Sequence, residues 1–310
     1  MLILAARRLV SMALIMAVIS FTLFAIFESD KLAVAGKVLG PYSSNEQREL
    51  WLTQNGYDEP FLERYATWVG NAMVGDFGNS IQFKVPVSEI MWPRLANTGI
   101  LAGLYMLFMI PLSLTLGVIA GMKEGSLQDR VVSIGSVLTT SVPEFASATF
   151  FTAIFVFSLG WLPGTSAMTG GFTWAEIVLP VLVLVMYGFG YTARMTRASM
   201  AEVMTSHYIR TAVLKGIPYR RVIMKHALRN ALIAPFTVII LQLNWLLSGV
   251  IVVEVFFAYK GFGKLLLDGA LFGDIYVIEA CTLVAVFVAV FSQFISDIGY
   301  TLLNPRIRFT

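Results

Sequence analysis

Residues 194–235 read RMTRASMAEVMTSHYIRTAVLKGIPYRRVIMKHALRNALIAP, a polar stretch within an otherwise apolar chain. The stretch carries eight basic residues and one acid, and long apolar runs precede and follow it. A segment this polar cannot lie in hydrocarbon, so it is predicted to be a loop between two membrane spans. Its Lys and Arg content places that loop on the cytoplasmic side.

The same stretch predicts a folded loop, which we call the elbow (residues 200–230). Because residues 202–214 contain no Gly or Pro, they predict a first helix. One face of that helix would carry Met204, Tyr208, Thr211 and Ala212. Gly216 is expected to end it in a left-handed turn, and Pro218 to begin a second helix that runs to about Asn230.

The second helix is predicted to have two stripes. One is Tyr219, Ile223 and Ala227, and the other is the basic set Arg221, Lys225 and Arg229. A loop folded in this way is typical of a docking element. The alternative is an amphipathic hairpin that lies on anionic headgroups, held by Lys and Arg.

Composition independently indicates an integral membrane protein. The chain is 57% hydrophobic and 13% charged, with a mean hydropathy of +0.76. Its single cysteine, Cys281, excludes a disulfide framework and a cysteine metal site. His207 and His226 both lie in the elbow and are interpreted as helix-surface residues rather than metal ligands.

The hydropathy pattern predicts an all-α fold with six transmembrane helices and both termini in the cytoplasm. The spans are Leu9–Phe27, Asn97–Met122, Val131–Leu159, Trp174–Met195, Leu232–Phe257 and Tyr276–Ile298. Pro143 should kink the third span midway. Arg7 and Arg8 hold the N-terminus inside. A cleaved signal peptide, with Ala33–Ala35 as its cleavage site, is the competing interpretation of the first span.

We divide the chain into an N-terminal span (1–27), an outer segment (28–95) and a five-helix core (96–310). Between residues 28 and 94 nine acids outnumber six bases. Ser44 is predicted to cap a helix that runs toward Asn55 with Leu50 on its apolar side. A second helix is predicted from Pro60 to Val74, and a turn at residues 75–80.

The elbow closely resembles the cytoplasmic loop of ABC-importer permeases, in the B-type subunit of the dipeptide/oligopeptide branch. The matching runs are Glu202–Met204, Tyr208–Gly216, Arg220–Val222 and His226–Ile233. The resemblance implies that this loop docks into a groove of an ATPase subunit. His207 and Val213 depart from the branch, which leaves the fine contacts with the ATPase open. The residues implied to form the coupling loop are Tyr208, Arg210, Thr211, Ala212, Lys215, Gly216, Arg220 and Arg221.

The resemblance extends over essentially the whole chain. Residues 75–80 (GDFGNS), 254–263 and the tail 303–309 are similar to other signatures of the same branch. The resemblance implies a bacterial or archaeal cytoplasmic membrane and four kinds of partner: a second permease, two P-loop ATPases carrying ATP and Mg, an extracytoplasmic solute-binding protein, and membrane lipid. No cofactor is expected in this chain, and no nucleic-acid partner.

Two further sets of residues are candidates for the transport path. Glu144, with Pro143, is expected about midway through the third span, where a charged group is costly and therefore a functional candidate. A carboxyl at a helix interface, protonated or hydrogen-bonded, is the equal alternative. Asp76, Glu254 and Phe262 are candidates for an outer gate or a contact with the binding protein.

The motifs that the sequence lacks narrow the function. It contains no G-x-x-x-x-G-K-[ST] phosphate loop, so ATP hydrolysis would fall to separate subunits. It also lacks H-E-x-x-H and G-x-S-x-G, which leaves a membrane enzyme without a visible catalytic group. A stand-alone secondary transporter or channel remains the alternative. The substrate is open among peptides, glutathione, nickel complexes, sugars and opine-like compounds.

Overall fold

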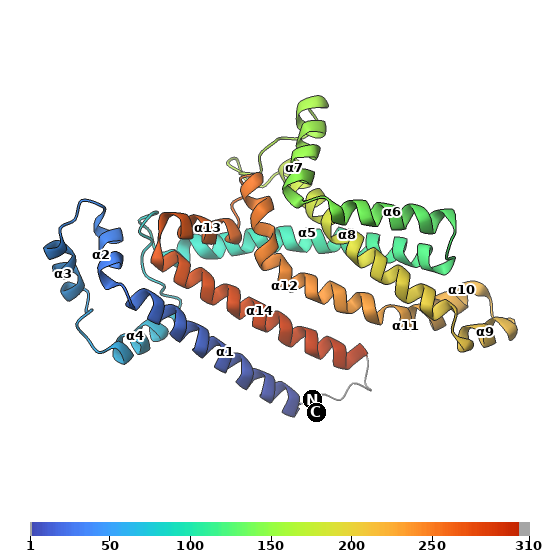
Figure 1. Ribbon diagram of the computed structural model, residues 1–310, viewed down its shortest axis with the longest axis horizontal. Helices are drawn as coiled ribbons and strands as arrows, with labels where there is room; N and C mark the ends of the chain where they lie inside the picture. The colour runs from blue at the N-terminus through green and yellow to red at the C-terminus, as the bar shows by residue number, and fades with distance from the viewer. Residues whose placement is uncertain (1, 304–310) are drawn as a thin grey trace. The chain divides into compact units, whose positions relative to one another are not determined.

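The computed structural model describes residues 2–303, whose regular elements are all helical apart from an isolated bridge between Asn79 and Pro86 (Figure 1). The predicted tail signature at 304–309 lies outside the described residues. The elements are α1 (Leu2–Glu28), α2 (Lys31–Leu39), α3 (Asn45–Gln54), α4 (Phe61–Met73), α5 (Val87–Met122), α6 (Leu127–Ser141), α7 (Glu144–Thr152), the π-helix η1 (Ala153–Ser158), α8 (Trp174–Met204), α9 (His207–Leu214), α10 (Tyr219–Arg221), the π-helix η2 (Val222–Ala227), α11 (Leu228–Ala231), α12 (Ile233–Phe256), α13 (Phe262–Phe272) and α14 (Ile275–Leu303).

Four helices in the described part of the chain are long and apolar enough to cross a membrane without interruption. They contain the segments Ala6–Glu28, Val87–Met122, Trp174–Met204 and Ile275–Ser296. Two bent pairs, Leu127–Ser141 with Glu144–Ser158 and Tyr219–Ala231 with Ile233–Leu243, raise the number to six if each pair is one span. The all-α membrane fold predicted from the sequence is confirmed. The third predicted span is broken, whereas the fifth coincides with the single helix α12 and the bend before it separates α12 from the elbow.

The break in the third span is much sharper than the predicted kink. Its two halves meet at 102°, and α7 leaves α6 almost at a right angle (Figure 1). Because a residue that precedes proline is disfavoured in the α region, Val142 adopts an extended conformation with ψ 123°. Pro143 then stands just before α7 with ψ 149°, and a new helix starts at Glu144. The proline therefore ends one helix and redirects the next.

The described chain forms two compact units, with boundaries at Asn97/Thr98 and Lys260/Gly261. Unit 1 holds the residues up to Asn97 together with Gly261–Phe294, and unit 2 holds Thr98–Lys260 with a short C-terminal piece. The first boundary lies close to the predicted division at 95/96. The predicted core of residues 96–310 is divided, however, because α13 and most of α14 belong to unit 1.

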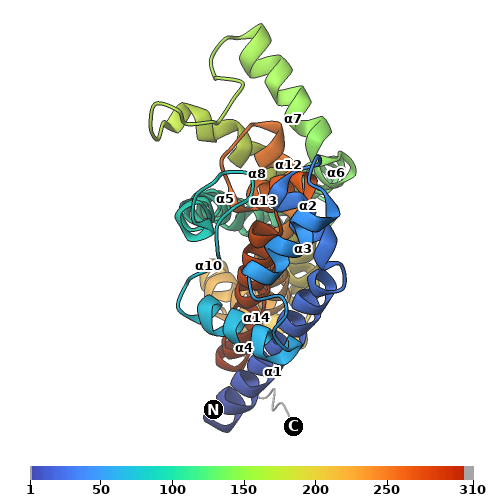
Figure 2. The same ribbon diagram turned by 90° about the vertical axis from the view of Figure 1, so that its left-hand side faces the viewer.

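Unit 1 contains the outer helices expected from the sequence. Ser44 accepts a hydrogen bond from the Gln47 N–H while the Gln47 side chain accepts one from the Ser44 N–H, a capping box that fixes the start of α3. The predicted apolar side of α3 is wrong, because Leu50 is 59% exposed. Helix α4 packs on α1, and α2 packs on α3 (Figure 2). Helices α2 and α13 were not predicted, and α2 contains the tripeptide 33–35 considered above as a cleavage site.

Unit 2 is built around α8, which packs against α6 and α12. It also approaches α5 at Gly117 and Gly121. A Cβ atom on Gly117 would lie 2.7 Å from the carbonyl oxygen of Ala193, and one on Gly121 would lie 2.6 Å from that of Arg197. Glycines four residues apart allow two membrane helices to approach with their backbones in contact. This packing fixes the part of α8 that leads into the elbow.

Candidate functional site

The elbow has the helix–Gly–helix form predicted from the sequence. Helix α9 ends at Leu214, and Gly216 follows with φ +73°, in the left-handed region that favours glycine. Pro218 is the residue before α10 rather than its first helical position. From Tyr219 the chain continues through α10, η2 and α11 as far as Ala231.

The first helix of the elbow starts later than predicted. Residues 202–204 are the last turn of α8, and a break at Thr205 and Ser206 separates them from α9. The four positions predicted to share one face are therefore not on one continuous helix. Ile209 and Ala212 form the buried face of α9 instead, while Tyr208 and Thr211 are exposed.

A small apolar core holds the elbow together. Ile209, Ala212, Val222, Ile223 and Ala227 are all buried and pack with Met200 at the end of α8. The amide of Asn230 also donates a hydrogen bond of 3.0 Å to the Tyr208 hydroxyl, which joins α11 to α9. Since Ile223 and Ala227 are buried, most of the predicted apolar stripe is confirmed; Tyr219 is 49% exposed. The elbow is thus a folded element with its own interior.

The basic side chains of the elbow lie on its surface. Arg221, Lys225 and Arg229 are exposed, as the predicted stripe requires, and so are Arg210, Lys215 and Arg220. None of the six forms an ion pair with another residue in the described part of the chain. The elbow therefore presents a cationic face that is available to an external partner.

An ion pair anchors the helix that leads into the elbow. The guanidinium of Arg197 on α8 donates to both carboxylate oxygens of Asp129 on α6, at 2.5 and 2.8 Å. Asp129 also accepts a hydrogen bond of 2.8 Å from the Gly125 N–H and one from Ser133. Asp129 is only 4% exposed. The pair is not predictable from the sequence, because 68 residues separate its two members.

Polar side chains gather around a cavity of about 330 Å³ within unit 2. The Tyr105 hydroxyl donates to the Gln242 side-chain oxygen, and the Gln242 amide donates to the Thr192 hydroxyl at 2.7 Å. Tyr187 and Trp245 stack at 5.1 Å along one wall. These residues belong to α5, α8 and α12, so this cavity lies among the apolar helices.

Arg194 brings a positive charge to the same cavity. Its guanidinium donates to the Thr140 hydroxyl and to the Gly190 carbonyl oxygen, both at 3.3 Å. Glu144, the predicted path residue, is half-buried and does not line the cavity. The neutral residues Tyr105 and Gln242 were not predicted, because a neutral side chain in an apolar span lacks the energetic cost that marks a charged one as a candidate.

The turn at 75–80 is a built structure in unit 1. Asp76 accepts a hydrogen bond of 3.0 Å from the Gly78 N–H, and both glycines of the turn have positive φ. The buried Ser80 hydroxyl donates to Asp274 at 2.5 Å. Asp274 also accepts from the Gln82 N–H at 3.0 Å, so it ties the turn to the start of α14. Asp76 itself is exposed and available for contact.

The other two outer candidates are interior residues. Glu254 is 0% exposed and accepts a hydrogen bond of 2.5 Å from the Thr98 hydroxyl. Phe262 is 1% exposed and packs with Val87, Met91 and Leu265 in the core of unit 1. Neither side chain reaches a surface in this conformation, and a role of either at an outer gate stays a prediction.

Residues 113–309 match the model of a protein family described as the inner membrane component of binding-protein-dependent transport systems. The chain belongs to that family. It is a permease subunit of an ABC importer, of the dipeptide/oligopeptide type, and a multi-pass membrane protein. The matched range includes the elbow and most of the residues around the cavity.

Relatives of this permease align over nearly its full length. The oligopeptide transport system permease protein AppB of Bacillus subtilis is 31% identical over 98% of both chains. A putative peptide transport system permease protein of Brucella abortus is 33% identical over 96% of this chain and 95% of its own. The glutathione transport system permease protein GsiC of Shigella flexneri is 34% identical over 88% of each chain. The alignments with the AppB and Brucella abortus proteins cover at least 96% of this chain, so they include most of the outer helices, which precede the range matched by the family model.

Proposed function

We propose that this permease forms half of a translocation pathway for peptides or similar small solutes, and that a second, similar permease supplies the other half. The observation that carries the proposal is the elbow, a folded element with its own core and an unpaired basic face. A folded element of this kind can be moved as a rigid body by a partner that docks on it. The similarity to permeases whose names state oligopeptide and glutathione transport supports the substrate class.

Two P-loop ATPases would dock on the elbows from the cytoplasm and carry the ATP and Mg. The sequence has no phosphate loop of its own. In the elbow, Arg210, Lys215, Arg220 and Arg221 are exposed and would form the contact, with Tyr208 and Thr211 beside them. Ala212 is buried and would hold the shape of the elbow. An extracytoplasmic binding protein would deliver the solute, with the exposed Asp76 as a contact.

The elbow can act on the cavity through α8. That helix is continuous from Trp174 to Met204, and its end packs into the core of the elbow through Met200. Tyr187, Tyr191 and Arg194 of the same helix line the cavity. A rigid-body movement of the elbow would therefore move one wall of the cavity, as alternating access between two states requires. Both termini would lie in the cytoplasm and residues 28–95 outside.

The composition of the complex tests this proposal. The chain is tagged, extracted gently from its native membrane, and analysed by mass spectrometry for proteins that co-purify. We expect a second permease and one or two P-loop ATPases, and uptake that requires ATP. If the chain is isolated alone and transports in liposomes along an ion gradient without nucleotide, the proposal is wrong and a stand-alone secondary transporter takes its place.

Glu144→Gln tests whether the first residue of α7 belongs to the path. The substitution removes a charge but keeps the size of a half-buried side chain. We expect the uptake of solutes with a cationic group to fall by about tenfold, because one charge-assisted hydrogen bond contributes about 1.5–3 kcal/mol. The measurement is uptake by cells of cationic and neutral peptides. Equal uptake of all peptides by variant and parent would remove Glu144 from the path.

A further inference from the structure

The cavity among the apolar helices of unit 2 holds a positive charge that no residue of the described chain neutralises. Arg194 lines this cavity, and none of the described lining residues is acidic. The guanidinium forms no ion pair with any residue that the structure describes. Its two hydrogen bonds go to uncharged oxygens, those of Thr140 and Gly190, and its Nη1 has no partner in the described part of the chain. Because a charged group among membrane helices is costly unless it is paired, the counter-charge is expected to come from outside the chain.

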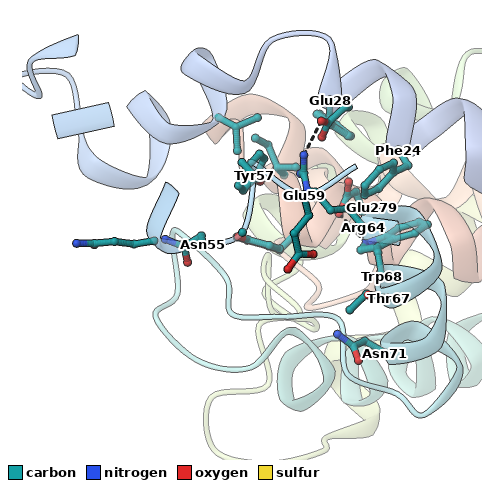
Figure 3. A pocket seen from close by; sticks show the side chains of 16 residues that line it. Phe24, Glu28, Asn55, Tyr57, Glu59, Arg64, Thr67, Trp68, Asn71 and Glu279 are labelled. Atoms are coloured by element: carbon teal, nitrogen blue, oxygen red, sulfur yellow. Dashed lines mark hydrogen bonds and ion pairs between the residues drawn. The ribbon is translucent and has the colours of Figure 1, made fainter. Parts of the chain in front are cut away.

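Two other arginines show how the chain pairs a guanidinium that it holds beside a cavity or between helices. Arg64 is the one basic residue, among those described, that lines a cavity of about 570 Å³ in unit 1, and it donates to Glu28 at 2.5 Å (Figure 3). Arg197 lies one turn beyond Arg194 on α8 and is bound to both carboxylate oxygens of Asp129. The chain therefore supplies a carboxylate to each of these two arginines and none to Arg194.

The Arg194 side chain is directed away from the elbow. Arg197 is bound near the start of α6, at Asp129, whereas Arg194 donates to Thr140 near the end of α6 and to Gly190 one turn earlier on α8. Asp129 and Thr140 are about 16 Å apart by helix rise, so the side chains of two arginines on adjacent turns diverge. A long basic side chain near the polar end of a span normally extends toward that end. The guanidinium of Arg194 is instead held at the cavity.

Aromatic side chains form the wall beside this charge. Tyr187, Tyr191 and Arg194 line the cavity together, and their spacing places them in one stripe on α8. Tyr187 also stacks on Trp245 of α12. The hydroxyls of Tyr187 and Tyr191 form no hydrogen bond with any residue that the structure describes, so both remain able to donate to a ligand.

The polar group on the opposite wall is already satisfied within the chain. The side-chain oxygen of Gln242 accepts from the Tyr105 hydroxyl, and its amide donates to the Thr192 hydroxyl and to the Gly188 carbonyl oxygen. Gln242 therefore fixes the shape of the cavity. The groups that remain for a ligand are a guanidinium and phenol hydroxyls, which donate hydrogen bonds, and the faces of aromatic rings.

These groups suit a carboxylate with an apolar neighbour. A guanidinium holds both oxygens of a carboxylate through two parallel hydrogen bonds, and aromatic rings pack against apolar side chains. The cavity volume of about 330 Å³ lies at the lower end of the range of ligand cavities, which is about 300–1,000 Å³. It therefore suits one end of a peptide rather than an extended chain.

We propose that this cavity binds the carboxylate end of the transported solute, and that Arg194 is the residue that recognises it. The inference rests on the proposed transport function and adds the chemical group that the permease itself selects. Arg194 donates to the carboxylate, the Tyr191 hydroxyl donates to it as well, and the neighbouring side chain of the solute packs against Tyr187 and Trp245. A solute whose carboxyl is converted to an amide loses the charge that Arg194 recognises.

Uptake of matched peptides tests the proposal. Cells that carry the transporter are given a tripeptide library, each member as the free acid and as its C-terminal amide, and uptake is measured by mass spectrometry. Arg194→Gln should lower the uptake of the free acids by about tenfold, because one charge-assisted hydrogen bond is lost. The uptake of the amides should stay close to that of the parent. The ratio of variant to parent is taken for each peptide, so a preference of the binding protein cancels.

The outcomes separate this inference from the transport function. If the parent takes up no member of the library, the proposed transport of peptides is wrong and the inference fails with it. If the parent takes up peptides and Arg194→Gln lowers the uptake of acids and amides equally, or of neither, the transport function stands and the recognition of a carboxylate by Arg194 is rejected.

Two further variants and a matched control locate the effect. Arg194→Lys keeps the charge but not the planar fork, so it should retain more uptake of the free acids than Arg194→Gln. Tyr191→Phe removes one exposed hydroxyl and should lower the uptake of the free acids selectively, by about threefold, which keeps the test decisive even if Arg194→Gln fails to fold. Arg130→Gln changes an exposed arginine of α6 that does not line the cavity and should leave both uptakes unchanged. A selective loss in Arg130→Gln as large as in Arg194→Gln would overturn the assignment to the cavity.

Retained lipid distinguishes the carboxylate of a solute from the phosphate of a lipid, since a guanidinium can hold either oxyanion. The purified transporter complex is prepared with phosphatidylglycerol, and the lipid that it retains is counted by native mass spectrometry. We expect the parent and Arg194→Gln to retain the same amount. Loss of phosphatidylglycerol in the variant, together with equal effects on free acids and amides, would assign the cavity to a lipid phosphate and overturn the proposal.

Discussion

Gly216→Val is expected to abolish ATP-driven uptake while leaving membrane insertion intact. Gly216 has φ +73° at the corner of the elbow, and non-glycine residues pay about 1–2 kcal/mol in that region, with a β-branched residue paying more. That cost lowers the ratio of folded to unfolded elbow by about five- to thirtyfold or more. The measurement is uptake, with the amount of permease in the membrane determined in parallel.

The effect should depend on backbone conformation rather than on space. A Cβ atom on Gly216 would meet nothing within 4 Å, so valine causes no clash. Gly216→Asn is therefore the matched control, because asparagine adopts the left-handed region more readily than other residues. We expect Gly216→Asn to retain much more uptake than Gly216→Val. Loss of uptake in both variants to the same extent would point to a requirement for a bare backbone at the docking surface.

Asp129→Ala should give the largest loss of stability among single changes near the elbow. It leaves the Arg197 guanidinium without the partner that holds it at 2.5 Å, and it removes the acceptor of the Gly125 N–H. Breaking a buried ion pair costs about 3–5 kcal/mol. Because the Arg197 side chain is 26% exposed, we expect the lower value of about 3 kcal/mol. The measurement is the thermal midpoint in detergent, followed by size-exclusion chromatography after heating.

Glu124→Gln is the matched control for that change. Glu124 contacts the same guanidinium at 3.4 Å, but its side chain is 67% exposed. An exposed pair of this kind contributes about 0–1 kcal/mol. The thermal midpoint of Glu124→Gln should therefore stay close to that of the parent. Equal shifts in the two variants would mean that the buried pair does not hold α6 to α8.

The features predictable from sequence were those that depend on a few neighbouring residues. The capping box needs only Ser44 and Gln47 three positions later, and both of its hydrogen bonds are present. The left-handed turn needs only Gly216. The elbow was also marked by its contrast with apolar flanks, which made its existence predictable. Each of these signals lies within one or two turns of chain.

The features that were missed depend on contacts between distant segments. Pro143 predicted a kink, but the 102° angle between the two halves depends on an extended Val142. The burial of Glu254 rests on Thr98, which lies 156 residues away in the chain. The polar groups around Tyr105 come from helices whose sequences predict only apolar membrane spans. A hydropathy pattern locates such helices, but it does not tell which of their neutral side chains face a cavity.

The π-helical turn η2 has a consequence for chain length. In it the Leu228 N–H bonds to the carbonyl oxygen of Ile223, five residues back, so the turn holds one residue more than an α-helical turn. A chain shorter by one residue between Val222 and Ala227 would run as an unbroken α-helix, but residues 219–221 would turn by about 100° relative to α11. The direction in which the basic surface of the elbow faces therefore depends on the number of residues in this turn. A homologue with one residue fewer at this place would have an elbow that faces a differently shaped groove of its ATPase partner.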